Sequence, residues 1–384
     1  MHLLIDENIP CAADAFGPLG TVRTMPGRDI TSAAVREADV LLVRSVTPVG
    51  PALLAGSRVQ FVGSATIGTD HIDQAYLRQR GIAFAHAPGS NARSVVEYVL
   101  AAVVYLTTIS EMPLRGRTVG IVGCGNIGQR LADRLPALGV RVLRNDPPRA
   151  AAEGVGDFVG LEEVLRTADI VTLHVPLTTT GAHPTHHLFN TDTLAALQPG
   201  AWLINSARGA VVDNAVLEAA LPGGPPARAV LDVWEGEPTP RLPLLAQAAL
   251  ATPHIAGYSY DGKVRGTQML HDALCAHLGR SSVWSKEAVL AVDPEAFALT
   301  PPDPSLPQAA YLHALVRQMY DITADDAALR EVTSLPPDER GPHFVNLRKM
   351  YRRRRSFGRY TIAAAAVLHA YRTAVADGLG VQLV

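Results

Sequence analysis

Short, mainly apolar runs alternate with longer mixed stretches over the first hundred positions of the chain. Residues 3–5, 40–43 and 59–62 predict strands buried on both faces, and residues 31–38 predict a helix between two of them. Strands that alternate with helices in this way are typical of a parallel sheet covered on both faces. Residues 94–106 predict a longer helix that leaves this first domain and leads into the next.

The same alternation starts again at residue 118 and gives a second α/β pattern. The expected strands of this part are residues 118–122, 140–143, 170–173, 201–204 and 229–231. The pattern changes after about residue 286, and residues 301–304, Pro-Pro-Asp-Pro, have the composition of a linker. The residues that follow are Arg-rich, helical in pattern and end in an Ala-rich run. The sequence therefore predicts two α/β domains followed by a smaller third domain.

Composition narrows the class of protein. The chain has 384 residues, 48% of them hydrophobic and 18% charged, which is typical of a folded globule with two or three domains. Its net charge of −2 argues against nucleic-acid binding, because phosphate backbones select for a large basic surface. We therefore expect no nucleic-acid partner.

Cysteine usage and the apolar runs indicate where the protein resides. Cys11, Cys124 and Cys275 are odd in number and far apart, so they predict no disulfide framework and favour the cytoplasm. The chain starts with a strand pattern rather than a secretion signal. The longest apolar runs, residues 95–106 and 362–370, look too short to cross a bilayer. We therefore expect no membrane partner.

A glycine-rich motif follows the first strand of the second pattern. Residues 123–128 read Gly-Cys-Gly-Asn-Ile-Gly, and a helical stretch, residues 129–135, comes after them. In this setting the glycines permit a tight turn and let the backbone reach a dinucleotide pyrophosphate, which lies at the positive end of the helix. A purely structural glycine turn is the alternative. The context favours a dinucleotide site.

The second strand of this pattern ends at Asp146, 18 residues after Gly128. A carboxylate there can accept hydrogen bonds from the ribose hydroxyls and repels a 2′-phosphate, which favours NAD over NADP. Arg149 is the opposing feature, since an arginine could balance the charge of a 2′-phosphate. The predicted cofactor is NAD.

Three side chains with catalytic potential follow three successive strand patterns. They are Arg208, Glu237 and His254. Ligands and chemistry gather at the carboxyl ends of strands in sheets of this kind. A histidine suits proton abstraction from an alcohol, because its pKa lies near neutral pH. A carboxylate on its far nitrogen fixes the tautomer, and an arginine offers a planar fork to a substrate carboxylate. Taken singly, each could equally be an ordinary surface or loop residue.

Together these motifs resemble the D-isomer-specific 2-hydroxyacid dehydrogenases. The resemblance rests on residues 123–128, Asp146, residues 205–209, residues 232–237 and residues 253–256. It implies NAD-dependent oxidation of a D-2-hydroxy acid, with Arg208, Glu237 and His254 as the catalytic set. It also implies cofactor contacts, which are Gly123, Gly125, Asn126, Ile127, Gly128, Asp146, Val175, Ser206, Ala207, Arg208, Asp232 and Gly257.

The resemblance also implies a domain organisation. The fold expected is α/β, with two Rossmann-like, doubly wound parallel-sheet domains and a small C-terminal α+β dimerisation domain. A flavodoxin-like substrate-binding domain would be discontinuous, formed by residues 1–98 and 257–286. The NAD-binding domain would be residues 99–256, and the dimerisation domain residues 287–384.

Further motifs resemble one branch of that family, which acts on a phosphorylated four-carbon hydroxy acid. They are residues 5–10, 44–47, 68–73, 146–150, 256–259 and 262–267, with residues 320–349 resembling the C-terminal homodimerisation domain of that branch. This implies substrate contacts at Ser45, Thr66 and Tyr258, with Arg44 adding charge. Ile67 and Val175 depart from the branch, where a smaller residue and a threonine are expected.

Two alternatives remain open from the sequence. One is a related D-2-hydroxyacid dehydrogenase, such as one that acts on 3-phosphoglycerate. The other is a non-catalytic protein that senses NADH on the same fold. No metal site is expected at His183, His186 and His187, because no acidic residue or cysteine adjoins them in the sequence. The basic run 352–355 indicates a solvated face or ion pairs between subunits.

Overall fold

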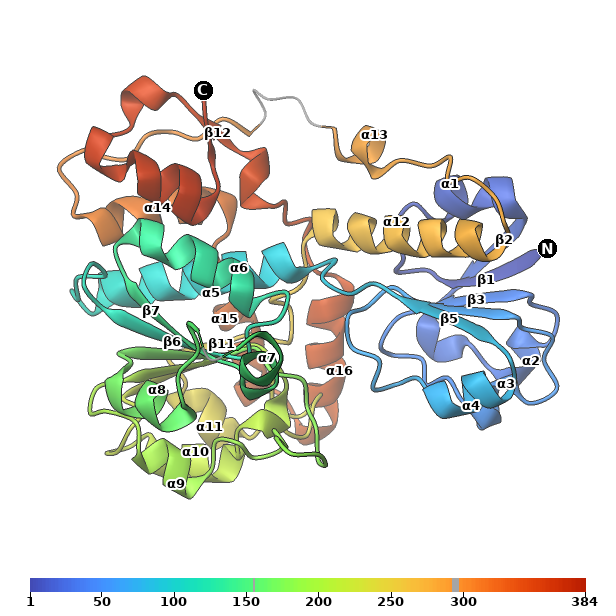
Figure 1. Cartoon of the computed structure of the whole chain (residues 1–384), viewed down its shortest axis with the longest axis horizontal. Coiled ribbons are helices and arrows are strands. Elements are labelled where there is room, and N and C mark those ends of the chain that lie inside the picture. The colour runs from blue at the N-terminus through green and yellow to red at the C-terminus, as the bar shows by residue number, and fades with distance from the viewer. Residues whose placement is uncertain (155, 292–296) are drawn as a thin grey trace. The chain divides into compact units, whose positions relative to one another are not determined.

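The computed structural model describes residues 1–154, 156–291 and 297–384. Contacts divide the chain into two compact units (Figure 1). The described parts of the first are residues 1–91 and 259–291, and those of the second are residues 92–258 and 297–384. Residues 292–296 of the expected third domain and residue 155 of the expected NAD-binding domain lie outside the described residues.

The first unit is a five-stranded parallel sheet. Its strands are β1 (His2–Asp6), β2 (Thr21–Met25), β3 (Val40–Val43), β4 (Phe61–Ser64) and β5 (Ala83–His86), in the order β2-β1-β3-β4-β5. Successive strands are added on opposite sides of β1 and β3, so the loops that follow these two strands flank a topological switch point. This is the flavodoxin-like order, and ligands bind at such points.

Both faces of this sheet are covered by helices. The helices are α1 (Ala12–Phe16), α2 (Ser32–Val35), α3 (Pro51–Leu54), α4 (Gln74–Gln79), α12 (Tyr260–His277) and α13 (Lys286–Leu290). Helices α1 and α12 lie on one face of the sheet and α2 and α3 on the other (Figure 1). One core contains Phe16 and Leu270 from α1 and α12, and the other contains Val35 and Leu54 from α2 and α3. The residues of β1, β3 and β4 are almost all buried on both faces of the sheet, whereas those of the edge strand β2 are mostly exposed.

The second unit has a six-stranded parallel sheet. Its strands are β6 (Thr118–Val122), β7 (Arg141–Asn145), β8 (Ile170–Leu173), β9 (Trp202–Asn205), β10 (Arg228–Leu231) and β11 (Leu250–Ala251), in the order β11-β10-β9-β8-β6-β7. The switch point of this sheet lies between β6 and β8. The glycine motif follows β6, so the expected dinucleotide loop is at the switch point.

Helices also cover both faces of the second sheet. They are α5 (Ala92–Ile109), α6 (Gly128–Arg134), α7 (Pro147–Glu153), α8 (Leu161–Thr167), α9 (Thr191–Ala195), α10 (Asn214–Ala220) and α11 (Leu242–Gln247). One core joins α5 and α6, and the other joins α8, α9, α10 and α11 (Figure 1). The doubly wound α/β class expected from the sequence is confirmed in both units.

Helix α5 is the one helix in the described part of the chain that is long and apolar enough to cross a membrane. In the structure 78% of its apolar window is buried inside the protein, which is what a core helix of a folded domain shows. Tyr98, Leu100 and Leu106 lie in the main core of the second unit. Length and composition of this one helix are therefore weak evidence for a membrane span.

The C-terminal segment is part of the second unit. It contains α14 (Gln308–Met319), α15 (Ile322–Arg330), α16 (Pro337–Lys349) and a small parallel pair, β12 (Thr361–Ile362) with β13 (Gln382–Leu383). Tyr311 of α14 joins the core around α5, while Leu329 and Phe344 of α15 and α16 join the other core. The segment thus shares both hydrophobic cores of the unit that carries the glycine motif.

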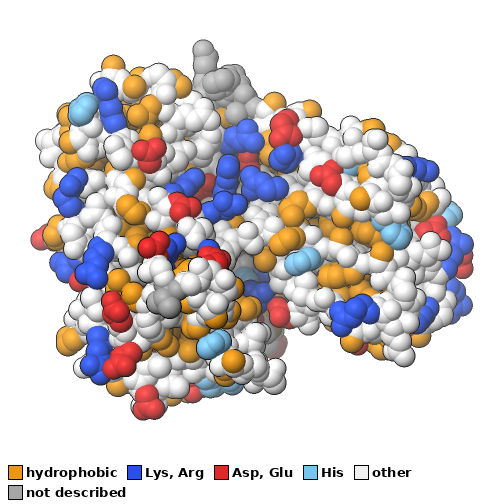
Figure 2. Space-filling view, in the orientation of Figure 1, with side chains coloured by type: hydrophobic (Ala, Val, Ile, Leu, Met, Phe, Trp, Pro, Cys, Tyr) orange, Lys and Arg blue, Asp and Glu red, His pale blue; other side chains and the backbone are white. Residues whose placement is uncertain are grey.

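Charged side chains are mixed over the surface. On the face drawn in Figure 2, Asp and Glu side chains lie among Lys and Arg side chains, in keeping with the net charge of −2. Such a mixed surface suits a protein whose ligand is held by a local basic pocket rather than by a broad basic face.

Candidate active site

Each of the three glycines of the motif has a different local geometry. Gly123 has a φ of +90°, which side chains rarely tolerate, and a Cβ on it would lie 2.7 Å from the backbone carbon of His174. A Cβ on Gly128 would lie 2.0 Å from the carbonyl oxygen of Gly123. Around Gly125, in contrast, no heavy atom lies within 4 Å of the Cβ position. The loop is therefore closed on two sides and open at Gly125, which fits the close approach of a pyrophosphate.

Asp146 is held beside this loop. Its Oδ2 accepts a hydrogen bond from the backbone N–H of Cys124 at 2.8 Å, and its Oδ1 caps helix α7 by accepting from the N–H of Arg149 at 3.1 Å. A carboxylate has about four acceptor positions, so these two bonds leave capacity for ribose hydroxyls. The position of the carboxylate is therefore fixed without using up its capacity as an acceptor.

Arg149 lies next to Asp146 but its charge is balanced within the chain. Its guanidinium binds Glu153 through two bonds, of 2.7 and 2.9 Å, and also donates to the Cys124 carbonyl oxygen. A cavity of about 260 Å³ is lined by Cys124, Gly125 and Arg149 together with Asn126. An arginine already paired with a carboxylate is a weak receptor for a 2′-phosphate, which favours NAD at this place.

The remaining expected cofactor residues differ in what they can offer. Val175 follows β8 and presents a methyl group to Gly123, so it offers packing and no hydrogen bond. Ser206 follows β9, and its hydroxyl is buried with no hydrogen-bond partner in the part of the chain that the structure describes. Buried polar groups are nearly always paired, so an unpaired hydroxyl at a strand end fits a ligand contact. Asn126 and Ile127 lie in the turn of the glycine motif.

The loop that carries Arg208 is fixed by two neighbours. Asn205, the last residue of β9, accepts from the Ala207 N–H at 3.1 Å and donates to the Arg208 carbonyl oxygen at 3.0 Å. Gly209 allows the loop to touch the next one, since a Cβ there would lie 2.1 Å from the backbone of Trp234. The Arg208 loop and the Glu237 loop are therefore in direct contact.

His254 and Glu237 come together at the ends of β11 and β10. The Nδ1 atom of His254 lies 2.8 Å from Oε2 of Glu237, and Oε1 of Glu237 accepts from the Trp234 N–H at 3.0 Å. Burial raises the pKa of Glu237, but the charge and hydrogen bond of His254 outweigh it and lower that pKa overall, with help from Trp234 and from the charge of Arg348. Glu237 is therefore an ionised partner for the imidazole.

Asp232 holds the backbone around His254. It is 1% exposed, and its carboxylate accepts from the Thr252 hydroxyl at 2.6 Å and from the N–H groups of Ile255 and Ala256 at 2.8 and 2.9 Å. His254 itself has a φ of +58°, an unfavourable conformation for a residue with a side chain. The hydrogen bonds of Asp232 stabilise this turn. The sequence suggested a cofactor contact at Asp232 and gave no sign of this positioning role.

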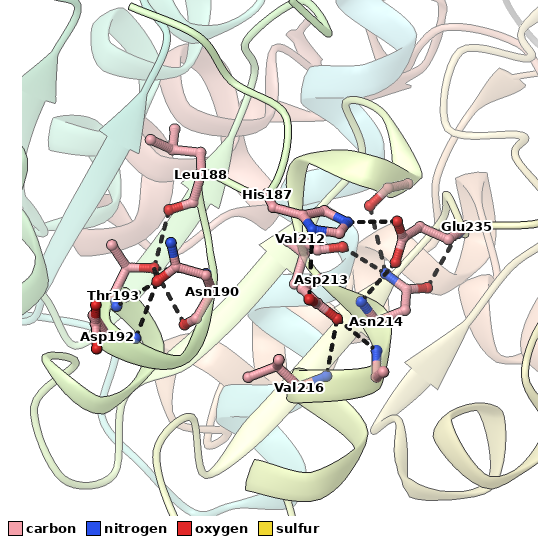
Figure 3. Close-up of polar contacts among 12 residues, drawn as sticks. His187, Leu188, Asn190, Asp192, Thr193, Val212, Asp213, Asn214, Val216 and Glu235 are labelled. Carbon is pink, nitrogen blue, oxygen red and sulfur yellow. Dashed lines mark hydrogen bonds and ion pairs between the residues drawn. The ribbon is translucent and has the colours of Figure 1, made fainter. Parts of the chain in front are cut away.

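His187 lies between two carboxylates, those of Glu235 and Asp213, neither of which adjoins the three histidines in the sequence (Figure 3). Its Nε2 lies 2.7 Å from Oε1 of Glu235, and its Nδ1 lies 3.4 Å from Oδ2 of Asp213. Both carboxylates come from loops distant in sequence, so the residues around the histidines give no sign of them. Among the described residues, His186, His187 and Glu235 have ligand atoms within 4.8 Å of one another.

The expected substrate residues of the first unit lie at the carboxyl edge of its sheet. Arg44 and Ser45 directly follow β3, beside the switch point, and Thr66 follows β4. The Thr66 hydroxyl is 2.7 Å from the Ser64 hydroxyl and donates to the Gly68 carbonyl oxygen at 3.0 Å. Hydroxyls and a cation at a switch point can bind an anion.

Tyr258 and Gly257 belong to the second unit, in the turn that follows His254. The Tyr258 ring meets the ring of Tyr351 edge-on at 5.8 Å, and the Arg348 guanidinium lies over it at 5.6 Å. Ile67, on the first unit, is partly exposed, and its carbonyl oxygen accepts from His86 at 3.1 Å.

A doubly wound sheet that carries a glycine-rich loop at its switch point, with an arginine and a carboxylate-paired histidine after other strands of the same sheet, is the arrangement of an NAD-dependent dehydrogenase. Residues 102–256 match the family model described as D-isomer specific 2-hydroxyacid dehydrogenase, NAD binding domain. Residues 304–375 match a model described only as a domain of unknown function.

Curated relatives identify the branch. The chain is 55% identical to erythronate-4-phosphate dehydrogenase of Salinibacter ruber, over 100% of this chain and 99% of that protein. It is 46% identical to the enzyme of the same name from Pseudomonas paraeruginosa, over the full length of both. The chain therefore belongs to the erythronate-4-phosphate dehydrogenase family, a branch of the D-isomer specific 2-hydroxyacid dehydrogenases.

Solved structures share the fold. The D-lactate dehydrogenase of Aquifex aeolicus, complexed with NAD and lactic acid, is 26% identical with a TM-score of 0.61. It covers 72% of this chain, while 95% of its own length is matched. This chain is therefore an oxidoreductase on a shared dehydrogenase fold, with a sizeable part that the lactate enzyme does not match.

Proposed function

We propose that the protein oxidises 4-phospho-D-erythronate to 3-hydroxy-2-oxo-4-phosphobutanoate with NAD, a step in the biosynthesis of pyridoxine 5′-phosphate. The observation that carries this proposal is the His254–Glu237 pair beside the Arg208 loop, in a chain 55% identical to an erythronate-4-phosphate dehydrogenase over its full length. The alternative substrates of the wider family, such as 3-phosphoglycerate, are not favoured by these relatives.

His254 is the general base in this reaction. Because its Nδ1 is engaged by Glu237, the neutral imidazole presents the lone pair of Nε2, which takes the proton of the substrate C2 hydroxyl. The carboxylate of Glu237 then stabilises the imidazolium that forms. NAD, when bound, accepts the hydride from C2.

Arg208 binds the substrate carboxylate and polarises the C2 oxygen. A planar guanidinium matches a carboxylate with two parallel hydrogen bonds, which also fixes the orientation of the substrate. The Asn205 bonds and the contact at Gly209 hold this arginine's loop beside the loop of Glu237. A pre-positioned arginine costs less entropy at the moment of reaction.

The cofactor residues are the glycine loop, Asp146, Ser206 and the neighbours expected from the family. We assign Gly123, Gly125, Asn126, Ile127 and Gly128 to the pyrophosphate and Asp146 to the ribose. The further assigned contacts are Val175, Ser206, Ala207, Arg208, Asp232 and Gly257. The opening at Gly125 and the unpaired Ser206 hydroxyl support this assignment, whereas Val175 contributes packing alone.

Substrate contacts are assigned to Arg44, Ser45, Thr66 and Tyr258. Hydroxyls and a guanidinium are the groups that recognise a phosphate dianion. The support within the first unit is the position of Arg44 and Ser45 at its switch point. Erythronate without its phosphate should then be a poor substrate.

Assembly and location complete the proposal. We assign a homodimer formed through the C-terminal domain, residues 287–384, and a cytoplasmic enzyme whose cysteines stay reduced, since all three are free. We also keep the division into a substrate-binding domain, residues 1–98 with 257–286, and an NAD-binding domain, residues 99–256. Sedimentation equilibrium of the full chain over a range of protein concentrations tests the dimer, because a single species with the mass of one chain would contradict it.

Turnover of a substrate panel tests the reaction. The purified protein is supplied with NAD and, separately, with 4-phosphoerythronate, erythronate, 3-phosphoglycerate and lactate, and NADH formation is followed. The proposal expects the highest kcat/KM for 4-phosphoerythronate. Equal or higher kcat/KM for another member of the panel would overturn the assignment, and no turnover with any member would favour a non-catalytic sensor of NADH.

A further inference from the structure

Helix α16 of the C-terminal segment runs against the loop that carries Glu237. At Gly341 a Cβ would make ordinary van der Waals contact with this loop, 3.4 Å from the ring of Pro238 and 3.5 Å from the side chain of Thr239. The last turn of the helix contains Arg348 and Lys349. The segment that no family description assigns a role to is thus in contact with a loop of the candidate active site.

Arg348 is the residue of this turn that reaches the candidate site. Its guanidinium lies over the ring of Tyr258, with 5.6 Å between the guanidinium carbon and the ring centre. Its Nε is buried and has no hydrogen-bond partner among the described residues. Its positive charge also acts on Glu237. A half-buried arginine over a tyrosine ring, with a buried N–H that no described residue accepts, has the chemistry of a receptor for an anion.

The chain after α16 is anchored to the turn that follows His254. Arg354 is 3% exposed, and its Nη2 donates to the carbonyl oxygen of Ala256 at 2.6 Å and to that of Ser94 at 3.1 Å. Its guanidinium also stacks over Tyr320 at 4.4 Å. A buried guanidinium with two backbone acceptors ties this segment firmly to the catalytic turn.

Tyr351 fixes the other side of Tyr258. Its hydroxyl donates to Oδ2 of Asp325 at 2.8 Å, and Asp325 also accepts from Tyr320 at 3.0 Å and binds Arg352. The Tyr351 ring then meets Tyr258 edge-on. Tyr258 therefore packs against a hydrogen-bonded network centred on the buried Asp325, and Arg348 lies over the ring that this network supports.

We propose that Arg348 binds the phosphate of the substrate together with the hydroxyl of Tyr258, so that the C-terminal segment determines the specificity for a phosphorylated hydroxy acid. This inference rests on the proposed function, in which Tyr258 contacts the substrate. The carboxylate of the substrate is already bound by Arg208 in that scheme, which leaves the phosphate as the anion for a second arginine.

The comparison with a relative of smaller substrate supports this inference. The Aquifex aeolicus enzyme, complexed with lactic acid, has a ligand without a phosphate, and it matches 72% of this chain. A phosphate at the far end of a four-carbon acid needs charged donors that lactate does not. Helix α16 supplies one from a segment described only as a domain of unknown function.

The test uses the full-length protein and three variants. Arg348→Gln removes the charge and keeps most of the length, Arg348→Lys keeps the charge without the planar fork, and Lys349→Ala is the matched control, an exposed cation one position further. Steady-state kcat and KM are measured with NAD for 4-phosphoerythronate and for erythronate. Melting curves check that each variant is folded.

We expect Arg348→Gln to lower kcat/KM for 4-phosphoerythronate roughly 10- to 100-fold, mainly through KM, as for the loss of a charge-assisted hydrogen bond. The value for erythronate should change less than about twofold, because that substrate has no phosphate to lose contact with. For 4-phosphoerythronate, the kcat/KM of Arg348→Lys should lie between that of Arg348→Gln and that of the unmodified protein. Lys349→Ala should have the same kcat/KM as the unmodified protein. If Arg348→Gln does not fold, Arg348→Lys tests the inference alone, through the ratio of kcat/KM for 4-phosphoerythronate to kcat/KM for erythronate.

Three results overturn the inference. An equal loss for both substrates would mean that Arg348 supports Glu237 or the fold instead. An unchanged Arg348→Gln in a protein that still prefers the phosphorylated substrate would mean that the phosphate is bound elsewhere, and the proposed function would survive. An unmodified protein that does not distinguish the two substrates would remove the phosphate site itself, and with it the substrate of the proposed function.

Discussion

The Nδ1 atom of His254 lies 2.8 Å from Oε2 of Glu237, although the two residues follow different strands, β11 and β10. Parallel strands bring their carboxyl ends to one edge of the sheet, so residues 17 positions apart become hydrogen-bond partners. Asp232 fixes the backbone on the His254 side, and Trp234 fixes the carboxylate on the Glu237 side. The pair is thus oriented from both ends before any substrate arrives, which is what a general base requires.

Replacing His254 by Ala should lower kcat by about two to four orders of magnitude, as expected for the loss of a general base. Binding of NAD should persist, because the glycine loop and Asp146 do not depend on the imidazole. Steady-state kinetics and titration of NAD by protein fluorescence measure the two quantities. A variant that turns over at nearly the normal rate would remove His254 from the mechanism.

Glu237→Gln should change how stability depends on pH. The pKa of Glu237 is lowered in the folded protein, where the effect of His254 outweighs the opposing effect of burial. The stabilisation by the ionised carboxylate is complete above the ordinary carboxyl pKa of about 4.3 and is lost as the pH falls through the lower folded value. The melting temperature of the unmodified protein should therefore approach that of the variant as the pH is lowered.

Thermal unfolding from about pH 6 to about pH 3 measures this difference. Glu162→Gln is a suitable control, because Glu162 lies on the surface of α8 and forms an exposed ion pair with Arg166. Exposed pairs of this kind contribute little, so the control should follow the unmodified protein at every pH. A gap between Glu237→Gln and the unmodified protein that stays constant with pH would contradict the role of the carboxylate charge.

Much of the fold was readable because its strands are buried on both faces. Strands β3, β6 and β8 lie where the apolar runs predict them, at Val40–Val43, Thr118–Val122 and Ile170–Leu173. Strand β4 begins at Phe61 rather than at residue 59, and α2 covers only Ser32–Val35. Strand β2 was missed because it is an edge strand with mostly exposed side chains, so it has no apolar run to show.

The sequence predicts residues of the candidate site only where they directly follow successive strands. Arg208, Glu237 and His254 each stand at a strand end, where local sequence marks a site. The carboxylates around His187 and the approach of Arg348 to Tyr258 depend on packing between segments far apart in the chain. No local pattern encodes such contacts, so the sequence alone does not predict that these side chains meet.

Asp146 should select NAD over NADP through its charge, and two substitutions separate this from its structural role. Asp146→Ser keeps a side-chain oxygen that can cap α7, whereas Asp146→Ala also loses the cap, at a cost of about 1 kcal/mol. Both should raise kcat/KM for NADP relative to NAD, since the repulsion of a 2′-phosphate is gone. Only the alanine variant should melt at a clearly lower temperature.

Kinetics with both cofactors and melting curves check this expectation. A protein that already uses NADP as well as NAD would show that Asp146 is not the selector. In that case Arg149 would be examined next, by replacing Glu153, which balances its charge in the structure.

Gly125 and Gly128 should respond in opposite ways to the same added methyl group. A Cβ on Gly128 would lie 2.0 Å from the Gly123 carbonyl oxygen, an overlap with backbone that only a shift of the loop could relieve. A Cβ on Gly125 meets no heavy atom within 4 Å, so the protein itself tolerates it. The methyl group would instead occupy the opening where a pyrophosphate approaches the backbone.

We therefore expect Gly125→Ala to melt like the unmodified protein while its KM for NAD rises roughly tenfold or more, because a close backbone contact is lost. Gly128→Ala should melt several degrees lower, in the range of about 1–3 kcal/mol expected for overpacking. Normal NAD kinetics in Gly125→Ala would place the pyrophosphate away from this loop, whatever the stability of Gly128→Ala.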